Sequence, residues 1–186
     1  MKQLKPIIQK NRGITLTEVM AVVAIIGILA AMAVPSFNEL IKQQRVEGAA
    51  EGLVAALQNA KAEAIKTNND MRIVFTPVAV NTDHSTWCYG MTKIGAATCD
   101  CTASTDCAAG SVIQSTDYSG ITINFNNENT RAFSRLRGGA LSTQGTVIFS
   151  AGNNKSLGVK LSTLGRIIIC KPTGTSISSY TDSGPC

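Results

Sequence analysis

Residues 12–34 read R-G-I-T-L-T-E-V-M-A-V-V-A-I-I-G-I-L-A-A-M-A-V, and this stretch decides the fold of the first part of the chain. A single carboxylate, Glu18, is followed by sixteen residues without a charged or strongly polar side chain, Val19–Val34. A helix from Ile14 to Val34 would be about 31 Å long at about 1.5 Å per residue, which matches a bilayer core of about 30 Å. The stretch therefore predicts a membrane-spanning helix.

The residues before this helix are basic. Residues 1–13 contain no acid and carry four bases, which are Lys2, Lys5, Lys10 and Arg12. Under the positive-inside rule this end stays in the cytoplasm and the residues after the helix cross the membrane. We therefore expect a single-pass membrane protein whose head lies on the side of the membrane away from the cytoplasm.

Glu18 lies one turn inside the expected span. A carboxylate in hydrocarbon is costly and is kept where it finds a partner, so Glu18 is a candidate functional residue. The alternative is that its side chain only extends to the membrane interface.

Three interpretations compete for this segment. A secretory signal peptide is supported by the basic start, the apolar run and an A-x-A cleavage site at residues 31–33, but the charge of Glu18 argues against it. The second is a signal anchor that is never cut. The third is a prepilin-type signal, which is cut before the apolar stretch.

The order G-I-T-L-T-E-V-M-A-V-V-A-I-I-G-I-L-A in residues 13–30 resembles the N-terminus of type IV pilins and pseudopilins. The resemblance implies cleavage by a prepilin peptidase between Gly13 and Ile14, N-methylation of Ile14, and Glu18 as the fifth mature residue. Ile14 departs from the family, in which phenylalanine or methionine is commoner there.

The resemblance also implies that Glu18 acts in assembly, in which the N-terminal helix contacts other minor and major pilins. In the family this glutamate is thought to pair with the free N-terminal amine of a neighbouring subunit. Opposite charges attract strongly in apolar surroundings, and pairing would select one stagger between helices. Pro35 lies where pilins often carry a helix-kinking proline, and it lacks a backbone donor.

A second, amphipathic helical section is expected over residues 36–70. Apolar residues recur at steps of three and four, which predicts one buried stripe: Val46, Ala50, Leu53, Leu57, Ala60 and Ala64. Charged residues fill the other faces, and the polar cluster of residues 67–70 should end the helix.

Residues 71–186 predict a small, mainly antiparallel β-domain with disulfides. Short β-branched runs, at residues 72–75, 111–113, 121–125, 146–149, 157–161 and 166–169, are separated by Asn, Gly, Ser and Thr clusters. Residues 151–155 should form a hairpin turn and residues 173–185 a surface loop. The expected fold class is thus α+β and pilin-like, with a leader at 1–13, a transmembrane or filament-core helix at 14–35, and the two parts just described.

All six cysteines lie in the β-domain: Cys88, Cys99, Cys101, Cys107, Cys170 and Cys186. An even number in a translocated domain predicts disulfides, with 15 connectivities open for six cysteines. Cys170 with Cys186 is the first pair expected, because it would close the C-terminal tail for roughly 3 kcal/mol. A zinc site built from the other four is the alternative, but their spacing is not that of the usual knuckle pair.

Several segments of the β-domain resemble the GspH/FimT family of minor pilins and pseudopilins. They are residues 56–66, Trp87–Gly90, Gly145–Phe149 and Leu164–Arg166. This resemblance implies a non-catalytic minor pilin, without cofactor or metal, that helps to initiate type IV pili used in twitching, adhesion or transformation. Two alternatives stay open: a pseudopilin of a type II secretion system, and a DNA-binding minor pilin for DNA uptake.

The charge balance gives little support to DNA binding. The pI of about 9.0 depends on the leader, since thirteen bases and twelve acids remain after residue 13. Arg131, Arg135 and Arg137 lie close together, and Arg166 falls in a motif that some DNA-binding family members carry as G-R-x-R. Here residues 165–168 read G-R-I-I, so the second arginine is absent. These four arginines are candidates for a DNA or subunit contact on a loop.

Catalysis is not expected. His84 is the only histidine, so a multi-histidine metal site or network is excluded. Asp83, His84 and Ser85 are adjacent in a polar loop, and adjacent residues seldom converge as a catalytic triad does. We predict a surface histidine there.

Overall fold

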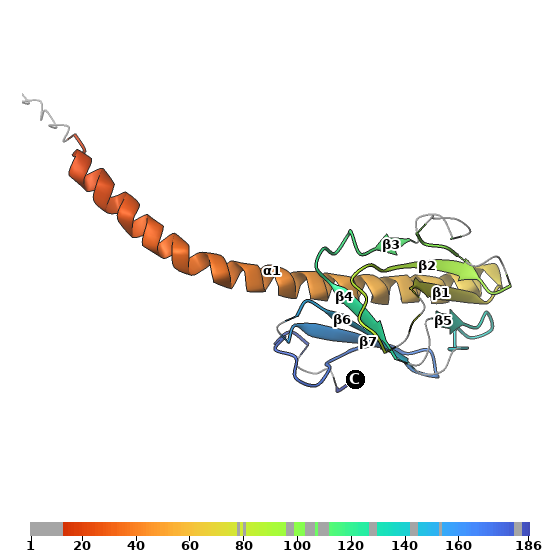
Figure 1. Ribbon diagram of the computed structural model, residues 1–186. Coiled ribbons are helices and arrows are strands. Elements are labelled where there is room, and N and C mark those ends of the chain that lie inside the picture. Colours follow the sequence, from red (N-terminus) through yellow and green to blue (C-terminus); the bar gives the residue numbers. More distant parts are fainter. Residues whose placement is uncertain are drawn as a thin grey trace, which may run out of the picture. The chain divides into compact units, whose positions relative to one another are not determined.

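The computed structural model describes residues 13–77, 79, 81–95, 99–102, 107, 112–126, 130–141, 145–152, 154–180 and 184–186, without the side chains of 33–35. Contacts divide the chain into Met1–Glu39, here called the N-terminal unit, and Leu40–Cys186, here called the head. One long helix, α1 (Leu16–Thr67), extends from the first unit into the second and is followed by strands (Figure 1).

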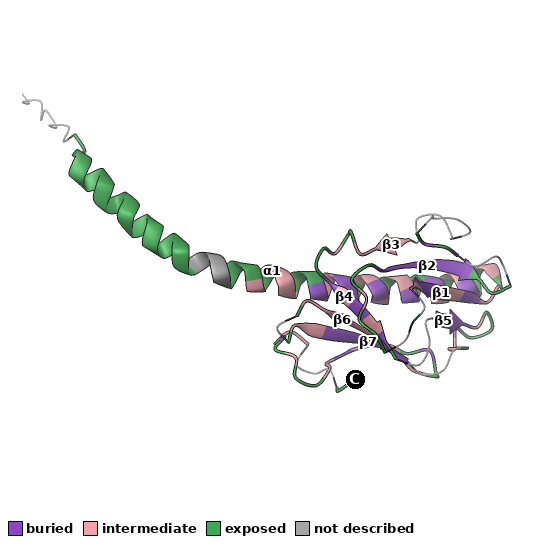
Figure 2. Cartoon of the chain, in the orientation of Figure 1, coloured by how far each residue is buried: buried purple, intermediate pink, exposed green. Residues whose placement is uncertain are grey.

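In the N-terminal unit, α1 is exposed from Leu16 to Met32 and from Ser36 to Asn38 (Figure 2). Its large apolar side chains are open to solvent, with Leu16 at 78% and Met32 at 71% exposure. Among the described residues α1 alone is long and apolar enough to cross a membrane. The helix continues through Pro35, whose side chain lies outside the described residues, so a kink at Pro35 stays a prediction.

The part of α1 in the head buries one stripe, as expected. All six residues of the predicted stripe are buried, and Ala49 joins them. The helix ends at Thr67, inside the predicted breaker cluster, and Asn68 follows with a φ of 52°. The amphipathic prediction for this section is therefore confirmed.

In the described residues, eight strands follow the helix. They are β1 (Met71–Thr76), β2 (Cys88–Lys93), β3 (Ile113–Gln114), β4 (Thr122–Phe125), β5 (Thr130–Phe133), β6 (Gly145–Ser150), β7 (Ser156–Leu161) and β8 (Ile167–Cys170). They form two antiparallel four-stranded sheets, in the orders β3-β2-β1-β5 and β4-β6-β7-β8. The α+β fold with a mainly antiparallel β-domain is thereby confirmed.

Two strands were not predicted. β2 contains Cys88, Gly90 and Met91 in place of a β-branched run, and it forms because it pairs residue by residue with β1. β5 carries Arg131 at its centre, opposite Ile73 of β1. In both cases pairing with a neighbouring strand overrides weak local propensity.

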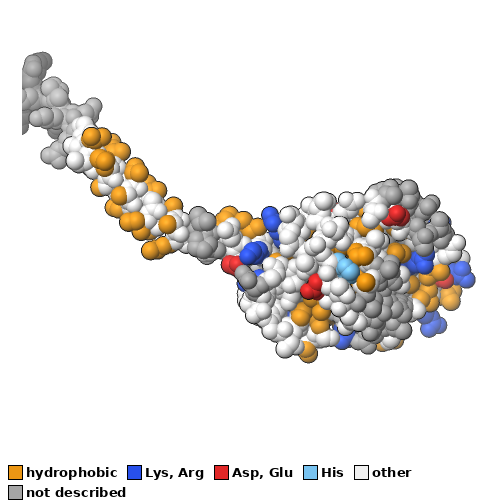
Figure 3. Space-filling model, viewed as in Figure 1, with side chains coloured by type: hydrophobic (Ala, Val, Ile, Leu, Met, Phe, Trp, Pro, Cys, Tyr) orange, Lys and Arg blue, Asp and Glu red, His pale blue; other side chains and the backbone are white. Residues whose placement is uncertain are grey.

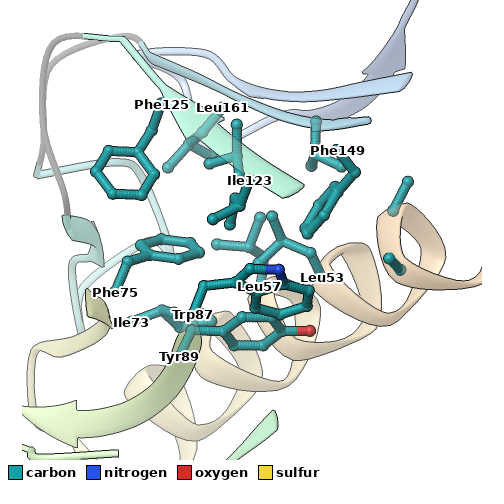
Figure 4. Close-up of a cluster of buried hydrophobic side chains, with 14 of the residues drawn as sticks. Leu53, Leu57, Ile73, Phe75, Trp87, Tyr89, Ile123, Phe125, Phe149 and Leu161 are labelled. Carbon is teal, nitrogen blue, oxygen red and sulfur yellow. The ribbon is translucent and has the colours of Figure 1, made fainter. Parts of the chain in front are cut away.

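The two sheets and the helix share one hydrophobic core (Figure 4). Leu53 and Leu57 of α1 face Trp87, which precedes β2, Tyr89 of β2 and, from the other sheet, Phe149 of β6. Trp87 stacks on Tyr89 with centroids 6.1 Å apart and meets Phe149 edge-on at 5.6 Å. The head is thus held by aromatic contacts between elements distant in sequence.

Two glycines of α1 let the side chain of Tyr118 come close to the helix backbone. A Cβ at Gly52 would lie 2.9 Å from the hydroxyl oxygen of Tyr118, and one at Gly48 would lie 3.3 Å from its ring. Tyr118 therefore packs directly on the helix backbone.

The C-terminal tail is more than a surface loop, so that prediction is corrected. Ile177 is buried in the core, and the backbone N–H of Ser176 donates to the carbonyl of Asn154 at 2.7 Å. The apolar Ile177 makes burial of the tail favourable. The hairpin turn is as expected: the N–H of Lys155 donates to the carbonyl of Gly152 at 2.9 Å between β6 and β7.

Candidate functional site

The start of α1 is fixed by a side-chain cap. The backbone N–H of Glu18 donates to the hydroxyl oxygen of Thr15 at 3.3 Å, which places Thr15 at the N-cap and Glu18 at the third helical position. A carboxylate in the first turn also interacts favourably with the helix dipole. This cap was not predicted, although T-x-x-E at residues 15–18 is its usual sequence signal.

Glu18 borders a shallow depression of about 290 Å³ on the exposed helix of the N-terminal unit. The other lining residues are apolar: Ile14, Val19, Val22 and Val23. One acceptor in an apolar surface of this kind suits a neighbouring cation that arrives with its own apolar helix. Gly13 and Ile14 are exposed and precede the helix in non-helical backbone.

The four bases of the leader lie outside the described residues, so the cytoplasmic location of this end of the chain stays a prediction. The roles of Gly13 and Ile14 in processing, and of Glu18 in assembly, likewise stay predictions at this point.

Three disulfides close the head, and the described part of the chain has no free cysteine. Cys170 bonds Cys186, the pair expected from the sequence. The other two bonds are interleaved, Cys88 with Cys101 and Cys99 with Cys107. Since all six thiols are bonded to one another, the zinc alternative for the first four is abandoned.

Glycines let two of these disulfides pack on the sheets. A Cβ at Gly158 in β7 would lie 2.4 Å from the sulfur of Cys186, and one at Gly90 in β2 would lie 2.6 Å from the sulfur of Cys99. Each of these two disulfides therefore packs against a strand at a position where only a glycine leaves room.

The four candidate arginines are not equivalent. Arg131 lies in β5 with 1% exposure, and its Nη1 donates to the carbonyl of Thr130 at 2.8 Å. A Cβ at Gly145 would come within 2.4 Å of Nη2 of Arg131, so the guanidinium occupies the space that this glycine leaves. The prediction that Arg131 lies on a surface loop is wrong, because the strand pairing turns its side chain inward.

Arg135, Arg137 and Arg166 are exposed, in two turns that approach each other. A Cβ at Gly165 would lie 2.4 Å from the carbonyl oxygen of Gly138. The structure therefore brings these three arginines onto one end of the head and leaves Arg131 out.

The tail is hydrogen-bonded to α1. Ser179 donates to Glu47 at 2.6 Å, and the Tyr180 hydroxyl donates to Glu51. Partial burial and this bond to Glu51 raise the pKa of Tyr180 to about 12. Burial also raises the pKa of Tyr89, whose hydroxyl lies in the core.

The trio at residues 83–85 does not converge. Asp83 accepts a hydrogen bond from Asn124 at 2.7 Å, and Nε2 of His84 lies 2.9 Å from the carbonyl oxygen of Ala79. His84 is half-buried, bridges to Ile123 of β4 and stacks on Phe125, so the prediction of a plain surface histidine is only partly right. Within the described residues no group of three or more His, Cys, Asp or Glu could hold a metal.

Two protein families match the sequence. Residues 49–165 match the family described as type II transport protein GspH. Residues 8–34 match the prokaryotic N-terminal methylation motif. The two matches together include Gly13, Ile14 and Glu18 as well as Arg131, Arg135 and Arg137.

Known proteins with similar sequence are fimbrial. The chain is 53% identical over 46 residues to the type IV major fimbrial protein FimA of Dichelobacter nodosus, which is 25% of this chain and 27% of that protein. It is 40% identical over 67 residues to a fimbrial protein of Pseudomonas aeruginosa, 36% of this chain and 43% of that one. The matches thus span less than half the length of these relatives.

A crystal structure of the type IV minor pilin FimU of Pseudomonas aeruginosa is also similar. It covers 69% of this chain and 90% of its own, at 18% identity and a TM-score of 0.49.

Proposed function

Because the chain belongs to the GspH family, whose members are pilins and pseudopilins, we propose that it is a minor pilin that initiates assembly of type IV pili. In this role it is a structural, non-catalytic subunit. The observation that carries the proposal is the exposed apolar part of α1, which holds one carboxylate, Glu18, in its first turn. Such a surface is stable only when a bilayer or other helices cover it.

The N-terminal methylation motif supports the processing step. Prepilin peptidase would cut between Gly13 and Ile14, and the new amine of Ile14 would be methylated. Residues 1–13 would then be the leader, 14–35 the membrane and filament-core helix, 36–70 the section that continues into the head, and 71–186 the globular β-domain.

Glu18 is proposed to accept the positively charged amine of an adjacent subunit. The apolar depression around it would exclude water, and exclusion of water strengthens a charge pair while making an unpaired carboxylate costly. A helix that enters at the wrong stagger would leave Glu18 without a partner and would be rejected.

The three disulfides support an oxidising compartment for the head. We place the head in the periplasm, with α1 held in the inner membrane before the subunit enters the filament. The partners proposed are prepilin peptidase and the other minor and major pilins.

The test compares Glu18→Ala with Thr15→Ala in the native host. We expect Glu18→Ala to insert into the membrane normally and to lower the number of pili. Thr15→Ala removes the helix cap but keeps the carboxylate, so it should retain most pili. Unchanged piliation in Glu18→Ala, or an equal loss in both variants, would contradict an assembly role for the carboxylate.

The match to the type II transport family favours a second candidate, a subunit of a type II secretion pseudopilus. Deletion of the gene separates the two. Loss of twitching with normal protein secretion supports the pilus, whereas loss of secretion with normal twitching supports the pseudopilus.

A further inference from the structure

One end of the head carries an exposed surface built from two turns and the last turns of α1, here called the tip patch. Its apolar members are Ile65, Leu136 and Leu164, and its basic members are Lys61, Lys66, Arg135, Arg137 and Arg166. Figure 3 shows hydrophobic and basic side chains gathered at the right-hand end of the head.

The two turns and the helix touch one another. A Cβ at Gly165 would come within 2.4 Å of the carbonyl oxygen of Gly138, and one at Gly138 would lie 2.7 Å from Cε of Lys61. Nζ of Lys61 also donates to the carbonyl of Gly165 at 3.2 Å. Residues from three separate parts of the sequence therefore form one continuous surface.

The apolar members are unusually open. Leu164 is 86% exposed and Leu136 is 80% exposed, the two highest values among the large apolar residues described in the head. Ile65, on the exposed face of α1, is 52% exposed. Its Cδ1 would lie 3.2 Å from a Cβ at Gly138, so it adjoins the same turn. Clustered apolar side chains rimmed by charge are typical of protein contact sites.

The turns that present these leucines are internally fixed. The N–H of Gly138 donates to the carbonyl of Ser134 at 2.9 Å, and the N–H of Gly165 donates to that of Ser162 at 2.9 Å. The N–H of Arg135 donates to the Asp70 carboxylate at 2.8 Å, which fastens one turn to the chain after α1. A surface ordered in advance loses little entropy when a partner binds.

The tip patch is positively charged. Its five bases adjoin two carboxylates, and both carboxylates are engaged within the head. Glu63 lies 3.5 Å from Lys66, and Asp70 accepts the bond from Arg135. Arg137 and Arg166 are exposed and lie next to the leucines in the sequences Arg135-Leu136-Arg137 and Leu164-Gly165-Arg166.

We propose that the tip patch docks the head of another pilin-like subunit, at a surface that holds carboxylates around an apolar hollow. The inference rests on the proposed function, since it assumes that this chain works within a filament. Leu136 and Leu164 would fill the partner's apolar hollow, and Arg137 and Arg166 would each donate two parallel hydrogen bonds to a carboxylate of the partner. The chemistry favours a protein over duplex DNA, because phosphates would engage the arginines and leave the leucines in water.

The test uses the full-length chain and each full-length pilin-like subunit of its own filament machine, purified in one detergent. Affinity is measured with immobilised wild-type chain and with Leu136→Glu, Leu164→Glu, Arg137→Glu and Arg166→Glu. We expect one subunit to bind the wild type and each substitution to weaken that binding at least tenfold. Replacing one acidic residue of the partner by a basic residue should restore its binding to Arg137→Glu or to Arg166→Glu.

Lys155→Glu is the matched control. It makes the same change of charge as the two arginine variants, and it lies in the β6–β7 turn, at the ends of these strands opposite the turn of residues 162–166, so it should change affinity less than twofold. Thermal unfolding of every variant checks that the head stays folded.

Three outcomes would overturn the proposal. One is that no subunit binds the wild type, and another is that the leucine variants bind as well as the wild type. The third is that the substitutions abolish binding to a duplex DNA probe, or to phosphatidylglycerol vesicles, and spare subunit binding. The result is separate from the piliation test of Glu18, because this binding is measured between purified chains and needs no filament.

Discussion

The hydroxyl of Tyr180 donates a hydrogen bond to the carboxylate of Glu51, and this bond joins the C-terminal tail to the middle of α1. Ser179 makes a parallel contact with Glu47, one helical turn away. Residues 179 and 180 therefore form a strap across α1 at these two carboxylates.

The Tyr180 contact gives a pH-dependent contribution to stability. Partial burial and the Glu51 bond raise the pKa of Tyr180 from 10.0 to about 12 in the folded protein. The unfolded chain loses the phenol proton first, so the contribution is complete below pH 10 and disappears as the pH rises toward 12. Tyr180→Phe should melt below the wild type at pH 8, and the difference should shrink above pH 10.

Ser179→Ala is the control for this measurement. It removes the neighbouring bond to Glu47, and a serine hydroxyl does not titrate in this range, so its deficit should stay constant with pH. A deficit of Tyr180→Phe that is also constant from pH 8 to 12 would show that the phenol proton is not the cause.

Gly165→Ala should destabilise the head by about 2 kcal/mol or more. Gly165 has a φ of 76°, and a Cβ there would lie 2.4 Å from a backbone oxygen, which cannot move aside as a side chain can. Gly139→Ala is the matched control, because a Cβ there meets nothing within 4 Å. Equal unfolding midpoints in denaturant for the two variants would contradict the close approach of the two turns.

Arg131→Ala should cost at least about 2 kcal/mol of folding stability, because it empties a buried site in β5. Arg137→Ala changes an exposed side chain and should stay within about 0.5 kcal/mol of the wild type. Chemical denaturation of the full-length chain measures both. Equal stability of the two variants would show that the inward placement of Arg131 is wrong. If Arg131→Ala is the less stable variant, any loss of function that it causes is explained by its lower folding stability.

The paired change Cys170→Ser with Cys186→Ser should lower stability by about 3 kcal/mol, since it opens a loop of 16 residues. It should also release the tail locally. Amide hydrogen exchange at Ser176, which donates to Asn154, should then be faster than global unfolding predicts. The paired change Cys99→Ser with Cys107→Ser opens a different loop, so exchange at the Ser176 amide should then follow the global stability. Faster local exchange at Ser176 in both double variants would argue against the strap.

The helix could be predicted from sequence because its signals are local. The apolar run, the stripe from Val46 to Ala64 and the polar stop after Thr67 each lie within a few residues of the feature they define. The exposed, carboxylate-bearing start of α1 was predicted for the same reason. The T-x-x-E cap at residues 15–18 is an equally local signal and could have been predicted.

The parts that sequence did not predict depend on distant partners. β2 and β5 are strands because both pair with β1, which lies between them. Their own sequences, C-Y-G-M-T-K in β2 and T-R-A-F in β5, carry no signal for this pairing. Arg131 is an ordinary surface residue by type, and the space beside Gly145 that receives it exists only in the folded head. The tip patch likewise depends on the contact of two turns that lie about 27 positions apart.

The two sheets differ in how much of the chain each needs before it can close. β6, β7 and β8 are successive hairpin neighbours, so they can pair as soon as they exist. β1, which directly follows α1, stays without its β5 partner until Phe133 is available to meet Met71. Because distant pairings form slowly, the edge of β1 that later pairs with β5 stays open to wrong pairing with another chain until that part of the head has formed.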